Sequence, residues 1–483
     1  MTEELNYKKL GLKVGLEVHQ QLDTRYKLFC KCSTKMQEKE PFRIIKRKLH
    51  PVASELGKID TAAQFEYLRN RTFYYQVFKN ENCLVDLDEE PPHEIDKEAL
   101  MIALQIALLL NCKIPEEIQI MRKTVIDGSN PSAFQRTAIV GLNGYLNYKG
   151  GKILITQITL EEDAAAIVKE ENGIVTYRCN RLAIPLVEID TDLLIEYSPQ
   201  EIQEIAYLIG ITCRSTGKTK PGIGSIRQDI NVSISKSVRV EIKGVQELGM
   251  MAKIIENEVK RQLSEKVKEE TRMALPDGTT KFMRPLPGAN RMYPETDIPP
   301  VVIENEYIEN LKKNLPEPWT KRLAELKSKL KLSGQLANEI LRSEYLDLFE
   351  RIVKTKKVEP SIVASVFTQT IKDLERKEQI AVKNLNEKHF LELFAALEKK
   401  KIAKEAIPEI IVYFSKKAEN SINVAINELN LTAISIPELK KLIKDVITQP
   451  NITLDRAIGI VMSKVRGKID AQSVIKTVKE FMK

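Results

Sequence analysis

Strand-like and helix-like patterns of apolar residues alternate from residue 10 to about residue 300. The runs 152–160 and 231–242 are rich in isoleucine, valine and threonine, which favours β-strands. Segments 97–110 and 198–209 instead carry apolar residues at helical spacing. The second begins with Ser198 followed by proline, with Glu201 three residues after the serine, which predicts a capping box at a helix start. The pattern predicts an α+β fold for this region.

After about Glu304 the strand-like runs end, and lysine, glutamate, leucine, isoleucine and alanine dominate. Two apolar stripes at helical spacing are Leu323, Leu326 and Leu330, and, more weakly, Ile402, Ile407 and Ile411. The pattern predicts a chain of helices with a break near residues 400–415. We therefore expect a mixed α/β domain over residues 1–303, an all-helical domain over 304–405 and a small helical tail domain over 406–483.

Composition narrows the class of protein. The chain has 483 residues, 43% of them hydrophobic and 29% charged, which is ordinary for globular proteins. The apolar stretch 99–110 is too short to cross a membrane, and the charged N-terminal sequence resembles no signal peptide. The six cysteines are few for this length, so we expect a reducing, cytoplasmic location. A net charge of +8 permits a polyanionic partner without requiring one.

Acidic residues and a histidine mark the first candidate for chemistry. In the strand-like segment 15–21, alternation places Glu17, His19 and Gln21 on one face. Such groups are unfavourable to bury without a metal, a charged partner or solvent. A histidine on a strand more often makes a hydrogen bond than binds a metal, so the residues alone leave both interpretations open.

Two further acidic clusters follow apolar runs. Glu161, Glu162 and Asp163 come directly after one run, and Glu188 and Asp190 share a face of another. Each cluster alone is as readily a solvated edge as a site. Together they supply the oxygen ligands that Mg²⁺ prefers and often shares with substrate phosphates.

The cysteines give a weaker signal. Cys30 and Cys32 form a C-x-C pair, but no C-x-x-C pair follows. His50 and Cys83 are the nearest further candidates, at irregular spacing, whereas zinc sites need four ligands. We therefore expect unligated cysteines and no zinc.

Two loop-like segments are basic or polar. Segment 122–132 contains Arg122, Lys123, Ser129 and Asn130, and segment 283–297 is dense in proline and arginine. Arginine and lysine suit phosphate groups. Structural crossover loops are the alternative interpretation.

Several strings in these segments resemble one family, the B/E family of tRNA-dependent amidotransferases, and within it the archaeal-type E subunits of glutamyl-tRNA(Gln) amidotransferases. They occur in order along the first 300 residues. The strings are GLEVHQQLDT (15–24), KLFCKCS (27–33), DEEPPHEID (88–96), RKTVIDGSNPS (122–132), LEEDAA (160–165), NRLAIPLVEIDTD (180–192), GSIRQDINVSI (224–234) and MRPLPGANRMYPETDIPP (283–300).

The resemblance implies a chemistry. ATP would phosphorylate the γ-carboxylate of glutamate mischarged on tRNA(Gln), and ammonia would displace the phosphate to give Gln-tRNA(Gln). The site would lie in a cradle-shaped α+β domain, and the helical and tail domains would bind tRNA. The ammonia would come from an asparaginase-like glutaminase subunit, which implies a cytoplasmic hetero-oligomer with no membrane contact.

The resemblance also implies roles for residues. His19, Glu161 and Glu188 match the positions of the family's Mg²⁺ site. We expect catalytic roles for Glu17, His19, Arg227 and Lys243. We expect contacts with substrate or ATP from Lys123, Ser129, Asn130, Asp190 and Arg284.

The chain departs from the family pattern in two places. Bacterial B subunits carry a C-x-C pair followed by a C-x-x-C pair that binds zinc, and only Cys30 and Cys32 remain here. The archaeal-type E subunits usually carry an aspartyl-tRNA synthetase-like insertion before the segment ETRMALPDGTT, and here only about residues 264–268 occupy that position. Two alternatives remain. One is a bacterial-type B subunit, against which the string at 283–300 and the lack of a C-x-x-C pair both argue. The other is a tRNA-binding module without catalysis.

Overall fold

The chain forms two compact units, Met1–Trp319 and Thr320–Lys483. The computed structural model describes residues 5–36, 40–53, 57–220, 224–288, 291–341, 343, 345–378, 384–432, 434–448, 452–465 and 467–482. Each unit is considered by itself below.

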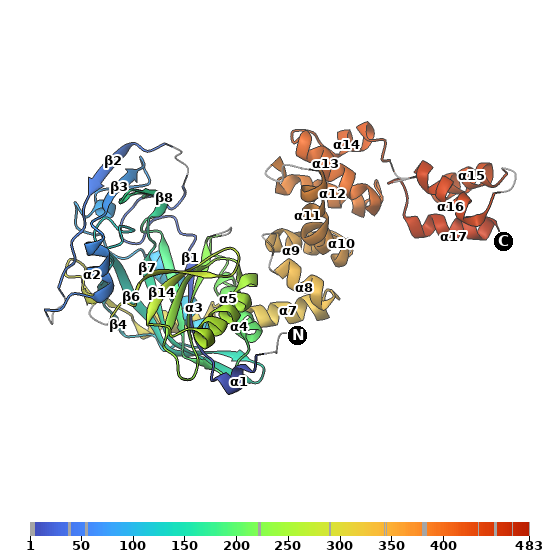
Figure 1. Cartoon of the computed structure of the whole chain (residues 1–483). Helices are drawn as coiled ribbons and strands as arrows, with labels where there is room; N and C mark the ends of the chain where they lie inside the picture. The colour runs from blue at the N-terminus through green and yellow to red at the C-terminus, as the bar shows by residue number, and fades with distance from the viewer. Residues whose placement is uncertain are drawn as a thin grey trace. The chain divides into compact units, whose positions relative to one another are not determined.

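A large, mostly antiparallel sheet forms the centre of the first unit (Figure 1). Its strand order is β15-β14-β13-β12-β1-β10-β7-β6-β5-β16, with β11 also paired to β1. The strands are β1 Lys13–Gln21, β5 Ile120–Thr124, β6 Phe134–Tyr148, β7 Gly151–Glu162, β10 Pro185–Thr191, β11 Leu194–Ile195, β12 Ile226–Ser233, β13 Val240–Val245, β14 Glu270–Ala274, β15 Thr280–Pro285 and β16 Met292–Pro294.

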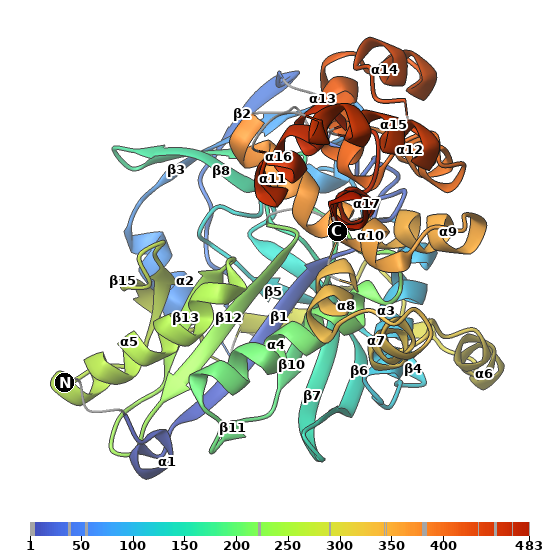
Figure 2. The same ribbon diagram turned by 90° about the vertical axis from the view of Figure 1, so that its right-hand side faces the viewer.

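Three helices cover one face of this sheet: α3 Lys97–Leu109, α4 Pro199–Arg214 and α5 Met251–Ser264. Figure 2 shows α4 and α5 lying across β1 and β12. The apolar residues of β1, such as Leu16 and Val18, pack with these helices in the main hydrophobic core. Because side chains alternate along a strand, Glu17 and His19 point to the opposite face. That opposite face is free of these helices and carries the polar residues.

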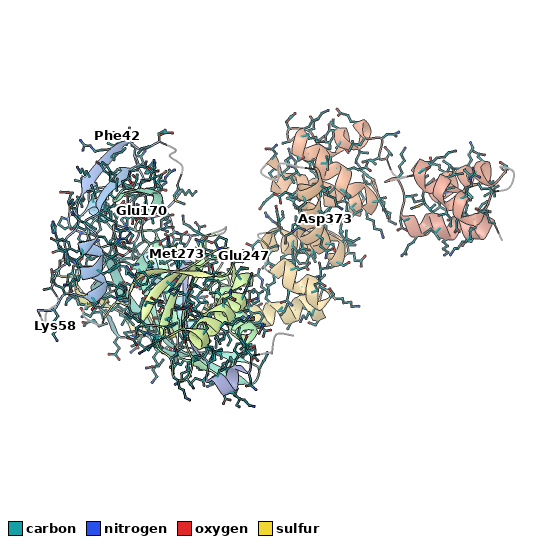
Figure 3. All side chains as sticks on the ribbon, in the orientation of Figure 1. Phe42, Lys58, Glu170, Glu247, Met273 and Asp373 are labelled. Carbon is teal, nitrogen blue, oxygen red and sulfur yellow. The ribbon has the colours of Figure 1, made fainter. Side chains whose placement is uncertain are left out.

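Two smaller sheets complete the first unit. One has the order β2-β3-β9-β8, from β2 Arg43–Arg47, β3 Thr72–Val77, β9 Ile174–Arg178 and β8 Ala166–Glu171. Its inner face packs Phe73, Tyr75 and Tyr177 into a separate small core, while Phe42 and Glu170 project outward (Figure 3). The other pairs β17 Val301–Val302 with β4 Glu117–Ile118. The remaining helices are α1 Tyr7–Leu10, α2 Thr61–Leu68 and α6 Asn305–Lys313.

Local sequence signals are mostly confirmed. The two expected helices are α3 and α4, the capping box of Ser198 and Glu201 is present, and the run 152–160 lies within β7. The single strand over 231–242 is wrong. A turn with Lys236 in the left-handed region (φ 68°) divides it into β12 and β13, which pair as a hairpin. The α+β fold class is confirmed.

In the described residues after Val302, only helices occur. The second unit contains α7 Trp319–Ser328, α8 Gly334–Leu341, α9 Leu346–Thr355, α10 Pro360–Ser365, a π-helical turn Val366–Thr370, α11 Ile371–Glu378, α12 Glu387–Glu398, α13 Ile407–Lys416, α14 Ile422–Glu428, α15 Ile436–Ile447, α16 Leu454–Val465 and α17 Ala471–Phe481.

Two hydrophobic cores organise these helices. The first joins residues between Leu326 and Leu431, and the second joins Leu439 to Val478 from α15, α16 and α17. Leu311 of α6 belongs instead to the core of the first unit. The domain limits 303/304 and 405/406 stay predictions.

No helix in the described ranges has the length and apolarity that a membrane span requires.

Candidate active site

The register of the central strands brings distant charged residues together on the face that the helices leave open. β1 lies between β10 and β12, so His19 is opposite Glu188 on one side and Arg227 on the other. Two residues before His19 on the same strand, Glu17 is likewise opposite Asp190 on one side and Asp229 on the other. Two polar rows therefore cross the middle of the sheet, as the alternation in β1 predicts.

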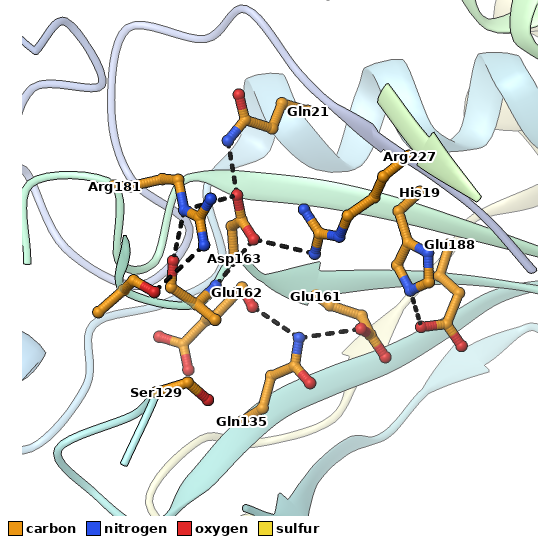
Figure 4. A network of polar contacts seen from close by, with 12 residues as sticks. His19, Gln21, Ser129, Gln135, Glu161, Glu162, Asp163, Arg181, Glu188 and Arg227 are labelled. Atoms are coloured by element: carbon orange, nitrogen blue, oxygen red, sulfur yellow. Dashed lines mark hydrogen bonds and ion pairs between the residues drawn. The ribbon is translucent and has the colours of Figure 1, made fainter. Parts of the chain in front are cut away.

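His19, Glu188, Lys123 and Glu161 form a connected group in the first row. His19 Nε2 lies 2.8 Å from Glu188 Oε2, and Figure 4 shows this pair. Lys123 Nζ donates to Glu161 Oε1 at 2.7 Å and lies 3.6 Å from Glu188 Oε2. Glu161 is 1% exposed, so its charge requires these partners. Lys123 therefore bridges the expected ligands Glu161 and Glu188, and His19 joins them through Glu188. Among the described residues, the three do not form a set whose ligand atoms all lie within 4.8 Å of one another, so the metal site stays a prediction.

Electrostatics within this group set its protonation. Burial disfavours the imidazolium of His19, but the adjacent Glu188 carboxylate outweighs it, and the His19 pKa is raised. Burial alone would raise the pKa of Glu188, yet Lys123 and His19 hold it well below its ordinary value. Glu188 is therefore ionised at neutral pH. An anionic carboxylate in a water-poor setting is suited to holding a cation.

A second acidic group lies beside the first. Ligand oxygens of Glu17, Asp229 and Glu241 lie within 4.8 Å of one another. Lys243 Nζ lies 2.7 Å from Asp229 Oδ2 and 2.8 Å from Glu241 Oε1, and Asn231 donates to Glu17 at 2.8 Å. Lys243 is thus paired with acids, which leaves its expected phosphate contact a prediction.

Asp190 differs from its neighbours. Gln157 Nε2 donates to its Oδ2 at 2.8 Å, whereas its Oδ1 is buried with no hydrogen-bond partner among the described residues. Burial, together with the negative charges of Glu188 and Glu17, raises the Asp190 pKa to about 8. Asp190 is therefore largely neutral at pH 7 and can donate a hydrogen bond to a ligand.

Arg227 is anchored at the edge of the first row. Its Nη2 donates to Asp163 Oδ1 at 3.1 Å, and Gln21 donates to Asp163 Oδ2 at 2.5 Å (Figure 4). Arg181 also lies near, 3.7 Å from Asp163. Asp163 is fully buried and fixes the guanidinium of Arg227 close to His19.

The loop between β5 and β6 places two expected residues, Ser129 and Asn130, near the end of β7. Ser129 Oγ donates to Asp127 Oδ1 at 2.7 Å, and its carbonyl accepts from the Ala165 backbone. Arg284 of β15 reaches the same carboxylate, Asp127 Oδ2, at 3.4 Å. Asn130 is 2% exposed within this loop. Their contacts with ATP or substrate remain predictions.

A cavity of about 300 Å³ opens next to the second acidic group. The chain runs from β15, at one edge of the sheet, to β16, at the other, so residues 286–288 and 291 cross the polar face. They line the cavity with Glu17, Glu241 and Arg239. Acids and arginines that line one cavity suit a phosphate group and its cation.

The donor sets fit Mg²⁺ in different ways. Glu17, Asp229 and Glu241 offer only oxygens, as Mg²⁺ prefers. Around Glu161 and Glu188, a metal ion would take the position of the Lys123 ammonium group, and His19 would have to come closer, because these three residues are not within mutual ligand distance among the described residues. The buried His19 Nδ1 has no hydrogen-bond partner in that part of the chain.

Sequence reasoning missed Asp229, Glu241 and Arg239, whereas Arg291 lies in segment 283–297, whose arginines were expected to suit phosphate. Asp229 shares the alternation of Arg227 along β12, so a signal was present in the string 224–234. Glu241 precedes Lys243 by two residues and shares its face of β13. Only the register of β12 with β13 shows that these acids meet Glu17.

Comparisons with known proteins show the family of the chain. Residues 12–309 match the family model described as the GatB/GatE catalytic domain, and residues 347–482 match the GatB domain. The chain is similar to proteins named as the E subunit of glutamyl-tRNA(Gln) amidotransferase. That of Methanocaldococcus jannaschii is 35% identical, with 98% of both chains covered. Those of Thermococcus gammatolerans and Pyrobaculum islandicum are 36% and 34% identical, with at least 98% of each chain covered.

The alignments are longer than this chain. That with the Methanocaldococcus jannaschii protein spans 620 positions, against 483 residues here. The relative therefore carries segments that this chain lacks, as expected for a chain without the large insertion.

Proposed function

Since the chain belongs to the GatB/GatE family, we propose that it is the tRNA-binding, kinase and transamidase subunit of a glutamyl-tRNA(Gln) amidotransferase. Its substrates would be ATP, ammonia and glutamate attached to tRNA(Gln). The observation that carries the proposal is the polar face of the central sheet, where acids and cations meet beside a cavity of about 300 Å³.

The reaction has two steps. An oxygen of the substrate γ-carboxylate attacks the γ-phosphorus of ATP, and ADP leaves, giving an acyl phosphate. Ammonia then attacks the carbonyl carbon, inorganic phosphate leaves, and a proton is lost from nitrogen. Phosphorylation is needed because a carboxylate oxygen is a poor leaving group. Phosphoryl transfer depends mostly on positioning and charge neutralisation.

Cationic residues of the site suit that neutralisation. Arg227 and Lys243 are each held by a buried carboxylate, so they are fixed before substrate arrives, as electrostatic catalysis requires. Arg239 and Arg291, which line the cavity, would bind phosphate oxygens. Asp190, being largely neutral, would donate a hydrogen bond to a substrate oxygen.

Mg²⁺ would be held by His19, Glu161 and Glu188, with the carboxylates of Glu17, Asp229 and Glu241 as a second set. When bound, it would supply positive charge to the phosphate oxygens of ATP. Lys123 would then move its ammonium group from between Glu161 and Glu188 towards the substrate.

The ammonia would come from a partner. We expect an asparaginase-like glutaminase subunit in a cytoplasmic hetero-oligomer. The names of the relatives, which designate an E subunit, support assembly with other chains. They also favour the archaeal type over a bacterial-type B subunit.

The test uses the purified full chain with ATP, Mg²⁺ and ammonium, with and without Glu-tRNA(Gln). We expect ADP release that depends on the charged tRNA. Gln-tRNA(Gln) should form with ammonium and not with glutamine, because the glutaminase is absent. Glutamine should become a donor once the partner subunit is added.

The opposite result would favour tRNA binding without catalysis. If the chain binds Glu-tRNA(Gln) tightly but releases no ADP, even with the partner subunit present, the kinase assignment is wrong.

A further inference from the structure

A cluster of cysteines lies outside the site described above. Cys30 and Cys32 are in the loop that follows β1, and Cys83 lies between β3 and a short 3₁₀ helix at Val85–Leu87. Their three sulfur atoms lie within 4.8 Å of one another. Cys30 is 4% exposed and Cys32 is 9% exposed. The fold thus brings together three thiols from two segments that are distant in sequence.

A carboxylate lies beside the group. Asp86 is 6% exposed, and its Oδ1 lies 3.9 Å from Cys30 Sγ. Its other oxygen, Oδ2, accepts hydrogen bonds of 2.7 Å from both Lys27 Nζ and Asn82 Nδ2. Oδ2 is therefore engaged, and Oδ1 remains available beside Cys30. Asp86 is outside the set of atoms that lie within 4.8 Å of one another, so Oδ1 would have to move towards Cys32 and Cys83 to act as the fourth donor.

These donors suit zinc. Sulfur ligands select zinc over Mg²⁺ or Ca²⁺, and structural zinc sites have four ligands in a tetrahedron. With zinc–sulfur bonds of about 2.3 Å, two sulfurs of a tetrahedral site are about 3.8 Å apart. The three sulfurs here lie within 4.8 Å of one another, which is compatible with that distance. Metal-binding carboxylates are usually held in place by further hydrogen bonds, as Lys27 and Asn82 hold Asp86.

The surroundings also balance charge. Three thiolates and a carboxylate would carry four negative charges, of which a Zn²⁺ ion offsets two. Lys27 is fully buried and contributes one more positive charge at Asp86. Simple packing of thiols would explain the buried sulfurs but not a buried ion pair beside them. A disulfide would use two of the cysteines and leave the third and Asp86 unexplained.

We propose that Cys30, Cys32, Cys83 and Asp86 Oδ1 bind one structural Zn²⁺ ion. The spacing of the cysteines alone favours unligated thiols, because Cys83 is far from Cys32 in sequence. The ion links the loop after β1 to the segment before the 3₁₀ helix, alongside the backbone hydrogen bond from Ser33 N to Asn80 O at 3.4 Å. β1 carries Glu17 and His19, so the ion fixes the end of the strand that supplies the site.

The first test measures metal in the full-length chain, purified without chelators. Elemental analysis should find about one zinc per chain. After removal of zinc, titration with Co²⁺ should give the visible absorption of tetrahedral cobalt and near-ultraviolet thiolate-to-metal absorption. No zinc and no such absorption in the wild-type chain would overturn the proposal, without reference to any variant.

The second test assigns the ligands. Cys83→Ala should bind Co²⁺ at least roughly tenfold more weakly than the wild type, because loss of even an outer partner of a metal ligand costs that much and Cys83 is proposed as a direct ligand. The matched control is Cys213→Ala, because Cys213 is fully buried in α4 but outside the cluster. The control should keep wild-type absorption. If Cys83→Ala binds Co²⁺ as the wild type does, these residues are not the ligands.

Should Cys83→Ala fail to fold, Asp86→Asn replaces it. This variant keeps the side-chain volume and all three thiols, and should retain the thiolate absorption with weaker affinity. Unchanged affinity would exclude Asp86 as the fourth ligand and contradict the four-donor site.

Discussion

Glu188 is the residue that links His19 to Lys123 in the candidate site. It is hydrogen-bonded to His19, and Lys123 lies within 3.6 Å. Its ionised state depends on these cations, and its charge in turn holds the raised pKa of His19. A neutral side chain of the same size would remove the charge and keep the shape.

We therefore predict that Glu188→Gln lowers ATP turnover roughly 100-fold or more, as expected when a charge that organises a phosphoryl-transfer site is lost. Turnover is measured as ADP release with saturating Glu-tRNA(Gln), and tRNA binding is measured in parallel. The control is Glu247→Gln, since Glu247 is exposed on the surface (Figure 3). Retained turnover in Glu188→Gln would exclude a role for this charge.

Glu295 makes a different kind of buried pair. Its carboxylate accepts from Arg122 Nη2 at 2.6 Å and from Arg136 Nε at 2.8 Å. It ties the segment after β16 to β5 and β6. Burial alone would raise the Glu295 pKa, but the two arginines and the backbone of Asp297 lower it.

The consequence is a pH-dependent stability. A carboxylate with a lowered folded-state pKa stabilises the fold above its unfolded pKa of 4.5 and loses that contribution as pH falls through the folded value. We predict that Glu295→Gln lowers the free energy of unfolding by roughly 3 kcal/mol at pH 7, because the buried Arg136 and the partly buried Arg122 lose the anion that they share. Denaturant unfolding should show the difference shrinking below pH 4.5.

A neighbouring acid provides the control for this pair. Asp297 contacts the same Arg122 at 3.2 Å, but its side chain is half exposed. Asp297→Asn should therefore change stability by less than about 1 kcal/mol at any pH. Equal effects of the two substitutions would show that burial of the Glu295 pair is not the source of its strength.

At the scale of elements, α3 packs closely against β6 on the apolar face of the sheet. Gly144 of β6 lies against the end of α3, where an added Cβ would be 2.3 Å from Cys112 Sγ and 2.5 Å from the Leu110 carbonyl oxygen. A backbone oxygen cannot rotate away as a side chain can. Glycine is therefore required at this position by packing, since its φ is not in the left-handed region.

We predict that Gly144→Ala lowers the free energy of unfolding by roughly 1 to 3 kcal/mol, the usual range for an overpacked core. Gly249→Ala is the matched control, because an added Cβ there meets nothing within 4 Å. Denaturant unfolding of both variants gives the comparison. If Gly144→Ala leaves the free energy of unfolding unchanged, the end of α3 can move away from β6 at little cost, and the packing argument is wrong.

At the scale of the whole molecule, α15, α16 and α17 have a hydrophobic core of their own. Ala406, Ile407, Phe414 and Leu431 instead belong to the core of the preceding helices. A deletion of residues 434–483 therefore removes one core and keeps the other, whereas a cut near residue 404 would divide a core. Exposed lysines of the removed helices are Lys440, Lys441, Lys444, Lys464, Lys476 and Lys479.

We predict that this deletion weakens tRNA binding roughly tenfold or more and reduces its salt dependence, because phosphate contacts by lysine are lost. ATP turnover at saturating Glu-tRNA(Gln) should change little, since every proposed site residue lies in the first unit. Fluorescence anisotropy at two salt concentrations measures binding. Equal tRNA affinity after deletion would argue against a role of these helices in tRNA binding.

The missing insertion belongs to the same scale. The alignment with a relative spans 620 positions, against 483 residues here, yet every residue proposed for catalysis is present. The polar face is built from central strands and their connecting loops, so the absence of an insertion at the position that the resemblance implies, between α5 and β14, would remove none of its side chains.

Local sequence encodes most elements and several site residues. The capping box of α4 depends on residues three apart, and the shared face of Glu17 and His19 follows from strand alternation, so both could be predicted. The quoted strings indicated the family. The split of 231–242 into a hairpin was missed because Lys236 adopts a left-handed conformation that its residue type does not favour.

Which residues meet depends on the tertiary fold. Strand register places Asp229 and Glu241 against Glu17, and the fold brings Cys83 to Cys30 and Cys32 across two loops. It also inserts Lys123 between Glu161 and Glu188. No local pattern encodes these pairings, because they depend on which strands lie side by side and on how the chain crosses the sheet. Periodicity determines which face a side chain takes, and only the fold determines what it meets there.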